Sequence, residues 1–363
     1  MAMLSMKKMM RLKFWKKMKN NFWEKLKKPI LALAPMAGVT DSAFRQICQK
    51  NGADVVYSEM ANVSALFFTL TPKLKTEDDI SNFLDPKNKK VDFGVGIKFS
   101  KTLGLVKSSK KEKCYVIQLF GKDPVHFAVA AKIITEKAKP AGIDINFGCP
   151  AKKVFGHGSG CALMPQKKLA REIISAVIEN TNLPVSIKIR AGIGETSALK
   201  FVKNVADLDF KAVMVHGRTY EGKFTGKVDF KLVEKIKKII PEKIILANGG
   251  ITKPEDGFEI LKNHPDLDGL GIARGTFGQP WIFQQIKDLI KKGKYKTYSL
   301  PMIKKVMIEH TELLWKEKEN RGMFEIRKHL AWYIKGFPGA SEMRKKLVLV
   351  KSLKELKNIL DKN

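Results

Sequence analysis

Eight short apolar runs recur between residues 29 and 275, and their spacing constrains the fold more than any other feature of this 363-residue chain. Each run is rich in Val, Ile and Leu, ends in a turn marked by Gly or Pro, and is followed by a helical stretch. Apart from one longer interval, the runs start roughly 23 to 42 residues apart, as a strand, a helix and two short loops require. The runs cover residues 30–38, 53–60, 114–121, 142–150, 184–192, 211–219, 243–250 and 267–275.

The segments between the runs complete the pattern. Residues 167–180 and 229–239 show helical periodicity, with apolar side chains along one side. Eight strand–helix units in series predict an α/β fold, a (β/α)8 TIM barrel over residues 29–295. A doubly wound open sheet is the structural alternative. The one long interval, about residues 72–113, is predicted to be a surface insertion.

After residue 300 the pattern changes to helices alone, so residues 296–363 are predicted to form a small helical bundle. A break at Gly336-Phe337-Pro338-Gly339 separates two of these helices. The apolar anchors expected in the core of this bundle are Leu313, Leu314, Ile326, Leu330, Tyr333, Ile334, Leu347, Val350, Leu353 and Leu356.

The formal net charge of +32 predicts a polyanionic partner. Much of the excess lies at the two ends, because residues 1–28 hold ten basic side chains against one acidic and residues 284–363 hold 20 against nine. In the first segment Trp15, Met18, Phe22 and Leu26 follow helical spacing, which predicts a basic amphipathic N-terminal extension. Such a helix can contact nucleic acid or an anionic membrane surface, pack on the domain behind it, or act as an organelle transit peptide.

Four cysteines without a CxxC pair form neither a disulfide framework nor the spacing of a zinc site. We therefore expect no bound metal and a reducing, cytoplasmic location. No stretch approaches the roughly 18 apolar residues of a spanning helix, and the lysine-rich first 28 residues lack the apolar run of a signal peptide. The sequence predicts neither secretion nor insertion into a membrane.

The active site of a TIM barrel forms where the strands end, because the loops that follow the strands gather there. Seven of the eight runs end in polar or cysteine residues, which a purely structural barrel does not need. These seven ends favour an enzyme over a bare scaffold. The end residues of all eight runs are Met36-Ala37-Gly38, Glu59, Gln118, Asn146 with Cys149, Lys188 with Arg190, His216 with Arg218, Asn248-Gly249-Gly250 and Ala273-Arg274-Gly275.

Some of these residues indicate an anionic ligand and an accessible thiol. Lys188 would face the barrel lumen, where an unpaired ammonium is costly. Its charge would be balanced either by an anionic ligand or by the carboxylate of Glu59 or Asp144. The Gly-rich turns after the last two runs are either a phosphate site or ordinary turns, and His216 either joins the site or caps its strand. Cys149 lies in a Gly-Cys-Pro turn outside a strand, where a thiol is reachable.

Five motifs in this set occur together in a known family. They read Ala34-Pro35-Met36-Ala37-Gly38-Val39-Thr40-Asp41, Gln118-Leu119-Phe120-Gly121, Asp144-Ile145-Asn146-Phe147-Gly148-Cys149-Pro150-Ala151-Lys152-Lys153-Val154, His216-Gly217-Arg218-Thr219 and Ala247-Asn248-Gly249-Gly250-Ile251. They resemble the motifs of the tRNA-dihydrouridine synthases, and the B-type bacterial branch is the most similar. The resemblance covers residues from about 29 to 350 and includes Arg327-Lys328-His329.

The resemblance implies an FMN-bearing barrel followed by a helical domain, residues 296–363, that holds tRNA. It implies an oxidoreductase that reduces the C5–C6 double bond of selected uridines in tRNA, with NADPH or NADH reducing the FMN. A cytoplasmic monomer without a membrane partner is expected. The target uridine would have to be extruded from the folded tRNA into the barrel mouth.

The resemblance also implies roles for single residues. Pro35, Met36 and Ala37 would lie against the flavin ring, with Gln118 at its edge. Lys188 would face the N1–C2 side, where negative charge collects on reduction. The residues expected at the phosphate are His216, Asn248, Gly249, Gly250, Ala273 and Arg274. The residues expected to contact the substrate are Asn146, which would orient the base, Lys152, Lys153, Arg190 and Arg218.

The resemblance also implies that Cys149 is the catalytic acid. Hydride transfer from flavin N5 to C6 of the uridine leaves carbanion or enolate character at C5, which needs a proton from the opposite face. A thiol with a reference pKa of about 8.5 is mostly protonated at neutral pH and can supply that proton.

Several features depart from the family pattern. Cys161 occupies a loop position where a small residue is usual, so two thiols lie close enough to form an adventitious disulfide. Ala273 replaces the glycine that is usual before Arg274, and neither the N-terminal extension nor the insertion is standard. The preceding string, Gly156-His157-Gly158-Ser159-Gly160, is interpreted as a flexible loop.

Two other functions fit parts of the pattern. An FMN barrel that reduces a small metabolite, such as a dihydroorotate or enoate reductase, would not need the basic tail. A non-catalytic tRNA-binding factor would not need the complete set of motif residues.

Overall fold

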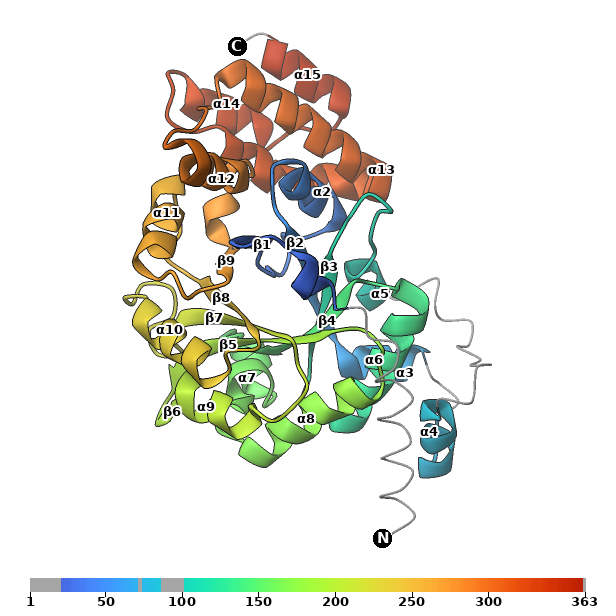
Figure 1. The fold of residues 1–363 in the computed structure, drawn as a ribbon. Coiled ribbons are helices and arrows are strands. Elements are labelled where there is room, and N and C mark those ends of the chain that lie inside the picture. Colours follow the sequence, from blue (N-terminus) through green and yellow to red (C-terminus); the bar gives the residue numbers. More distant parts are fainter. Residues whose placement is uncertain (1–20, 71–73, 86–100, 362–363) are drawn as a thin grey trace.

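The computed structural model describes residues 21–70, 74–85 and 101–361. Within these residues, the parallel strands of the barrel are β1 (Ile30–Leu33), β2 (Val55–Asn62), β3 (Tyr115–Phe120), β4 (Gly142–Phe147), β5 (Val185–Ile193), β7 (Ala212–Thr219), β8 (Ile244–Asn248) and β9 (Gly269–Ile272). Pairing of β4 with β5 and of β1 with β9 closes the sheet into a barrel (Figure 1). The predicted TIM barrel is confirmed, and the closed sheet excludes the open-sheet alternative.

Helices cover the outside of the barrel. They are α2 (Ser42–Lys50), α3 (Val63–Leu70), α6 (Pro124–Ile133), α7 (Lys152–Gly156), α8 (Lys167–Glu179), α9 (Ala198–Val205), α10 (Phe230–Ile239), α11 (Pro254–Asn263) and α12 (Ile282–Lys292), with short turns η3 (Ile134–Ala138), η4 (Gly160–Leu163) and η5 (Arg274–Thr276). A two-residue strand, β6 (Thr196–Ser197), pairs antiparallel with β5. Side-chain oxygens of Asp41, Asp123, Ser197 and Asp229 cap α2, α6, α9 and α10. The helices predicted at 167–180 and 229–239 are confirmed as α8 and α10.

The lumen of the barrel is packed with side chains and closed at one end. Successive strand residues face alternately the lumen and the helices, and Ile30, Val116 and Met214 belong to the lumen cluster. Trp23, from the short turn η1 (Phe22–Lys25), is 1% exposed and packs into the same cluster. The ring of Phe22 lies against Gly142, the first residue of β4. Because this plug covers the N-terminal ends of the strands, a ligand has access only from their C-terminal ends.

The N-terminal extension is described only in part. Residues 1–20, which hold most of the predicted amphipathic helix, lie outside the described residues. The part that follows packs on the barrel as the short 3-10 turn Phe22–Lys25, and Leu26 is extended, so the predicted helix does not run through Leu26. The four interpretations of the helix itself stay predictions.

The segment predicted as a surface insertion contains α4 (Glu77–Leu84) and α5 (Lys101–Leu105), and one of its last residues, Glu112, has a buried side chain. Glu112 Oε2 accepts a hydrogen bond from Arg45 Nε at 2.5 Å, and both side chains are fully buried. The ring of Tyr115 lies 4.3 Å from the Arg45 guanidinium carbon. The surface prediction is therefore wrong for Glu112, whereas its neighbours Lys111 and Lys113 are exposed as predicted. Glu112 stands in a run of lysines that is typical of solvent-exposed chain, and only the fold brings it to Arg45.

The C-terminal unit consists of helices, as predicted: α13 (Leu300–Tyr333), α14 (Ala340–Leu347) and α15 (Leu353–Asp361). Helix α13 is sharply bent, because Glu319 has φ 47° and ψ −128°. The rings of His310 and His329 lie 4.6 Å apart, whereas 19 residues of straight helix would span roughly 28 Å. The two halves of α13 therefore form a hairpin, which the sequence analysis did not predict.

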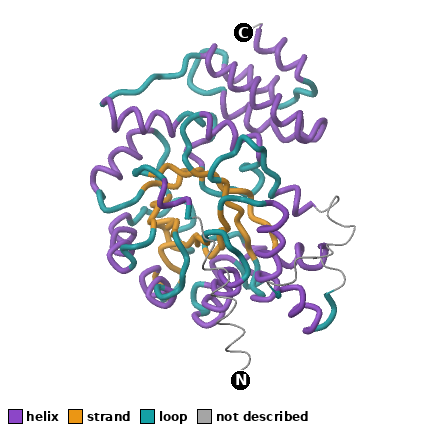
Figure 2. The backbone as a smooth tube through the Cα atoms, turned by 45° about the vertical axis from the view of Figure 1, so that its right-hand side comes forward, coloured by secondary structure: helices purple, strands orange, loops and turns teal. Residues whose placement is uncertain are grey.

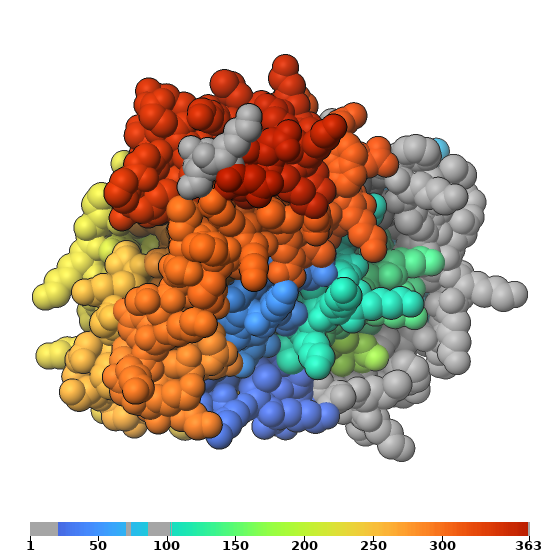
Figure 3. Space-filling view, turned by 90° about the horizontal axis from the view of Figure 1, so that it is seen from above, coloured from blue at the N-terminus to red at the C-terminus, as the bar shows by residue number. Residues whose placement is uncertain are grey.

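The helical unit packs against α2 of the barrel (Figure 1). In the turned view it forms a layer of helices above the strands of the barrel (Figure 2). The ring of Phe44 lies 5.5 Å from His310 and 5.0 Å from His329. Viewed from above, the tail adjoins the first units of the barrel (Figure 3). The break at residues 336–339 separates α13 from α14, and the predicted anchors are all buried or partly buried in the tail core. None of the described helices combines the length and the apolar character needed to cross a bilayer.

Candidate active site

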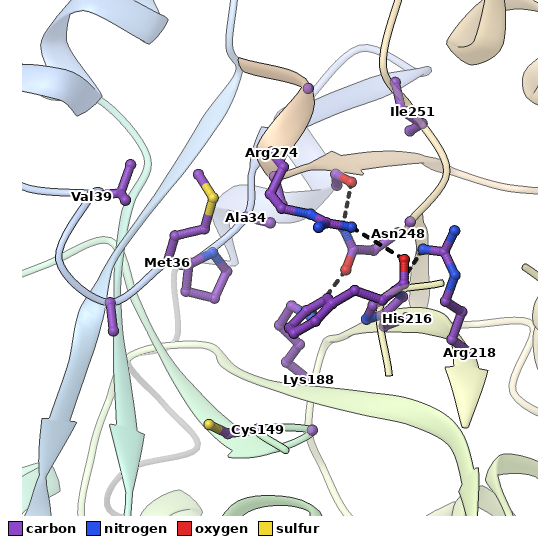
Figure 4. Close-up of a pocket in the computed structure, with 18 of the residues that line it drawn as sticks. Ala34, Met36, Val39, Cys149, Lys188, His216, Arg218, Asn248, Ile251 and Arg274 are labelled. Carbon is purple, nitrogen blue, oxygen red and sulfur yellow. Dashed lines mark hydrogen bonds between the residues drawn. The ribbon is translucent and has the colours of Figure 1, made fainter. Parts of the chain in front are cut away.

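A cavity of about 740 Å³ opens at the C-terminal ends of the barrel strands (Figure 4), within the usual range of ligand sites. All the residues predicted to bind a cofactor line it, together with Asn146, Cys149, Arg190 and Arg218. The predicted cofactor residues are Pro35, Met36, Ala37, Gln118, Lys188, His216, Asn248, Gly249, Gly250, Ala273 and Arg274. Lys152 and Lys153 do not line the cavity, since both are exposed on α7 behind the Cys149 turn.

One end of the cavity is built from the glycine turn after β8. Gly249 has φ +105°, and a Cβ there would lie 2.7 Å from His216 Cδ2. Only glycine therefore allows the backbone to approach His216 this closely. Arg218 and Arg274 lie at the same end (Figure 4). Open backbone and cationic side chains together suit a phosphate group.

His216 is neutral. Burial, followed by the charges of Lys188 and Arg190, lowers the pKa of His216 to about 2. Its Nε2 lies 3.4 Å from Arg218 Nη1. Because a guanidinium only donates, Nε2 accepts and Nδ1 carries the hydrogen. This side chain can orient a ligand but holds no spare proton for transfer at neutral pH.

Lys188 reaches into the cavity from β5. Its Nζ donates to Asn248 Oδ1 at 3.1 Å, and Asn248 Nδ2 donates to Gly271 O at 2.7 Å. Burial lowers the pKa of Lys188 to about 8, and the charge of Arg190 adds to the effect. Neither Glu59 nor Asp144 forms an ion pair with Lys188, since Glu59 binds the Gly38 N–H and Asp144 binds Gln118 and Ser186. The alternative of a direct ion pair with Glu59 or Asp144 is therefore wrong, although the charge of the buried Asp144 carboxylate still raises the pKa of Lys188.

Three arginines lie close to Lys188 in the cavity, namely Arg190, Arg218 and Arg274. Within the described part of the chain, no carboxylate lies in ion-pair distance of any of these four cations. The ring of Phe224 lies 5.5 Å from the Arg190 guanidinium carbon and 4.8 Å from that of Arg274. Phe224, an aromatic residue between two glycines just after the His216 motif, was not among the predicted site residues. The unpaired charge calls for an anionic ligand.

Cys149 lies partly buried in the turn after β4. Burial raises the pKa of its thiol and outweighs the nearby charges of Lys188 and Arg190. Asn146 Oδ1 accepts the backbone N–H of Gly148 at 3.0 Å and of Cys149 at 2.9 Å. The turn is thereby held in place, and the thiol keeps its proton at neutral pH.

The stretch before Cys161 supports the same turn. Gly160 has φ +63°, and a Cβ there would lie 2.9 Å from Cys149 O. The Cys161 N–H donates to that carbonyl at 3.2 Å. The interpretation of residues 156–160 as a flexible loop is therefore wrong at Gly160, which packs directly under Cys149.

Cys161 itself turns away from the cavity. Its side chain is fully buried, and its Sγ lies 3.9 Å from Met164 Sδ. Burial raises the pKa of this thiol to about 12. All four cysteines are free, so the disulfide considered above is not formed in the structure.

Two residues predicted to contact the substrate are engaged with the protein. Arg190 donates to Gly148 O at 3.0 Å, Thr219 O at 2.8 Å and Lys223 O at 2.9 Å. It therefore ties the Cys149 turn to the loop that carries Phe224. Asn146 holds the Cys149 turn from the other side. A contact of either side chain with substrate stays a prediction.

The helical tail also contributes to the mouth of the cavity. Lys335 lines it, and Phe277, another lining residue, stacks on Trp332 at 3.9 Å. On the opposite side, Gly38 donates its N–H to Glu59 and accepts a hydrogen bond from Lys328. These contacts join residues up to 290 positions apart, so local sequence patterns could not predict them.

Comparison with known proteins identifies the family. The model described as dihydrouridine synthase (Dus) matches residues 32–363. The chain belongs to the dihydrouridine synthase family. It is 33% identical over 318 residues to tRNA-dihydrouridine synthase B of Pseudomonas aeruginosa, with 86% of each chain covered. It is 29% identical over 335 residues to the probable tRNA-dihydrouridine synthase 1 of Synechocystis sp., covering 90% of this chain and 84% of the relative.

Among solved structures, histamine dehydrogenase from Rhizobium sp. 4-9 matches with a TM-score of 0.45 and 15% identity, over 79% of this chain and 48% of that protein. This likeness is too low to bear on function. Membership of the dihydrouridine synthase family makes the chain an enzyme, a tRNA-dihydrouridine synthase, and implies a tRNA substrate and a flavin cofactor. The cavity fits a flavin, because it combines a glycine turn, unpaired cations and the apolar Pro35-Met36 turn.

Proposed function

We propose that this dihydrouridine synthase uses FMN to reduce the C5–C6 double bond of uridines in tRNA, with NADPH or NADH as the reductant. One observation carries the proposal: a single cavity holds both the Cys149 thiol, whose pKa burial raises, and four cations that no carboxylate of the described residues reaches within ion-pair distance. FMN, when bound there, supplies the hydride that adds to C6 of the base. The remaining chemistry falls to the side chains of the protein.

The two ends of the cavity suit the two ends of FMN. The Gly249-Gly250 turn, with Arg218 and Arg274 beside it, would hold the phosphate. Pro35-Met36-Ala37 would lie against the ring. Lys188 would face the N1–C2 side, where its charge stabilises the negative charge of the reduced ring.

Cys149 would donate the proton to C5. A group in this role must be protonated before the reaction and must lose its proton without large cost. Burial keeps the thiol protonated before the reaction, and the nearby charges of Lys188 and Arg190 favour the thiolate that remains afterwards. His216 is not protonated before the reaction, since its low pKa leaves it without a transferable proton.

The tail offers a surface for tRNA. Phe324 is 65% exposed, and the Arg327 guanidinium carbon lies 4.5 Å from its ring centroid. Phe324, Lys328 and Trp332 are spaced four residues apart, so they share a face of the second half of α13. Lys328 and Trp332 already contact the residues around the cavity mouth. An aromatic ring beside a guanidinium stacks on nucleobases, and the excess of basic residues in the tail suits the phosphate backbone.

Replacing Phe324 by alanine is expected to weaken tRNA binding about tenfold, since stacking on one base contributes about 1 to 3 kcal/mol. Fluorescence anisotropy with a labelled tRNA at physiological salt measures the change. Phe324→Tyr keeps the ring and should bind like the wild type. Equal affinity of the alanine variant and the wild type would remove Phe324 from the tRNA surface.

The proposed function is tested by supplying the purified protein with FMN and NADPH or NADH and offering an unmodified tRNA transcript, free uracil or orotate. The proposal expects dihydrouridine in the tRNA and no reduction of the free compounds. Reduction of orotate or an enone instead would favour the metabolite reductase. Tight tRNA binding without flavin binding would favour the non-catalytic factor. The cytoplasmic monomer stays a prediction, which light scattering and cell fractionation check.

A further inference from the structure

The floor of the cavity contains a chain of hydrogen bonds that begins at a buried carboxylate. Asp144 is fully buried in the lumen. Its Oδ1 accepts from Ser186 Oγ at 2.6 Å, and its Oδ2 accepts from Gln118 Nε2 at 2.7 Å. Gln118 Oε1 accepts from Asn146 Nδ2 at 2.9 Å. Asn146 Oδ1 then accepts the two backbone N–H groups of the Cys149 turn.

The direction of every bond in this chain is determined from its end at the Cys149 turn. A backbone N–H can only donate, so the Asn146 oxygen must face the turn and its nitrogen must face Gln118. The Gln118 oxygen must then face Asn146, which leaves its nitrogen facing Asp144. Position 144 therefore has to supply an acceptor. With an apolar side chain there, the Gln118 N–H would be buried without a partner.

The same constraint decides what the cavity floor presents to a ligand. Gln118 and Asn146 both line the cavity. The Asn146 oxygen already accepts two hydrogen bonds, and each amide nitrogen carries a second hydrogen. The second Asn146 hydrogen is directed at Met60 Sδ, 3.7 Å from Nδ2, whereas no described residue accepts the second Gln118 hydrogen. The floor thus offers the Gln118 N–H, which matches a carbonyl oxygen of a flavin or uracil ring.

We propose that Asp144 is a positioning residue: as the obligatory acceptor at the buried end of the chain, it orients the Gln118 amide toward the ring bound in the cavity and, through Gln118 and Asn146, fixes the turn that carries Cys149. The part that concerns the ring rests on the proposed function. The part that concerns the Cys149 turn does not, because it depends only on contacts within the protein.

The charged surroundings of Asp144 are compatible with an acceptor. Burial raises the pKa of Asp144 to about 6, while bonds from Gln118 and Ser186 and the charge of Lys188 oppose the shift. The carboxyl is therefore ionised at neutral pH. Tyr57, on β2, is the other titratable group beside it, and burial together with the charge of Asp144 raises the pKa of that hydroxyl well above its usual value.

The test compares Asp144→Leu, which has no acceptor, with Asp144→Asn, which keeps one oxygen for Gln118. Two readouts use the apoprotein: the rate of Cys149 alkylation by iodoacetamide, followed by mass spectrometry of the peptide, and the affinity for added FMN. We expect Asp144→Leu to speed alkylation at least about threefold and to weaken FMN binding about tenfold, as expected for a buried donor left without a partner. Asp144→Asn should stay within about threefold of the wild type in both readouts.

Asp268→Asn is the matched control. Asp268 is 2% exposed and accepts from Ile245 N and Lys237 Nζ at 2.8 Å, at the closed end of the barrel. The Asp268→Asn substitution should lower the melting temperature and leave the alkylation rate and the FMN affinity unchanged. If Asp144→Leu does not fold, Gln118→Met breaks the chain one step later and should speed alkylation equally.

The outcomes separate this inference from the proposed function. Unchanged alkylation in the variant that breaks the chain would overturn the positioning role, and so would an Asp144→Asn variant as impaired as Asp144→Leu. Faster alkylation together with a wild-type protein that does not bind FMN would support the link to the Cys149 turn, overturn the part concerning the ring, and contradict the proposed cofactor.

Discussion

Replacing Cys149 by alanine is expected to slow dihydrouridine formation by about 10²- to 10⁴-fold, the usual contribution of a positioned general acid. FMN binding and its reduction by NADPH should be unchanged, because the alanine removes only the proton donor. The lost step is the protonation of C5, so the reduced flavin of the variant should persist when tRNA is added. Stopped-flow absorbance of the two half-reactions, with mass spectrometry of the tRNA, measures both effects.

A matched control for Cys149→Ala is available at the other end of the barrel. Cys114 immediately precedes β3 and lies among the lumen-packing residues at the closed end. Cys114→Ala should leave both half-reactions unchanged. An unaltered rate of tRNA reduction in Cys149→Ala would remove Cys149 from the acid role. A loss of FMN from this variant would indicate instead that the residue acts by shaping the cavity.

Replacing Lys188 by methionine is expected to weaken FMN binding and to slow flavin reduction about 10²-fold, comparable to the loss of one preorganised donor in an active site. Methionine keeps much of the length of the side chain and removes its charge. FMN titration of the apoprotein measures the affinity, and stopped-flow reduction by NADPH measures the rate of flavin reduction. Normal flavin content with normal reduction kinetics would exclude Lys188 from the flavin site.

The pH dependence of FMN binding gives an independent check. The pKa of Lys188 is lowered to about 8, so its charge is present below that pH and is lost above it. The affinity of the apoprotein for FMN should therefore fall as the pH rises through about 8, and Lys188→Arg should flatten this dependence.

Lys243→Met is the matched control for Lys188→Met, because it also removes a buried ammonium. Lys243 lies next to β8 and donates to Leu208 O at 3.0 Å and Phe210 O at 3.1 Å, away from the cavity.

The barrel was predictable from the sequence because each of its units is local. A buried parallel strand is a short apolar run, and a crossover helix of limited length must follow it. The position of most site residues followed from the same reasoning, since the ends of parallel strands meet on one face. Cys149, Lys188 and His216 were thus expected to lie close together, and all three line the cavity.

Contacts between distant segments were not predictable in this way. The hairpin within α13 depends on the backbone angles of Glu319 and on Gly322, where a Cβ would lie 2.5 Å from Leu314 O. Glu112 appeared as one charge in a lysine run, although it forms a buried ion pair with Arg45. In each case tertiary packing decides the role of the residue, and the neighbouring residue types do not.

Contacts within the protein made by two site residues were also not predictable from local sequence. The family resemblance implied that Asn146 and Arg190 contact the substrate, and that contact stays a prediction. In the folded chain their polar atoms hold the Cys149 turn and the Phe224 loop. Lys152 and Lys153 follow the same turn but lie outside the cavity, and their contact with the substrate stays a prediction.

The central claim is that this cavity transfers a hydride to a uridine of tRNA and a proton from Cys149. The most direct measurement is a single turnover: the FMN-loaded enzyme is reduced by NADPH under anaerobic conditions, freed of nucleotide and mixed with an unmodified tRNA transcript. The account predicts that the flavin is reoxidised while a uridine of the transcript gains two hydrogens, and that Cys149→Ala shows neither change on the same timescale. Reoxidation of the flavin by orotate or an enone, with the transcript unchanged, would contradict it.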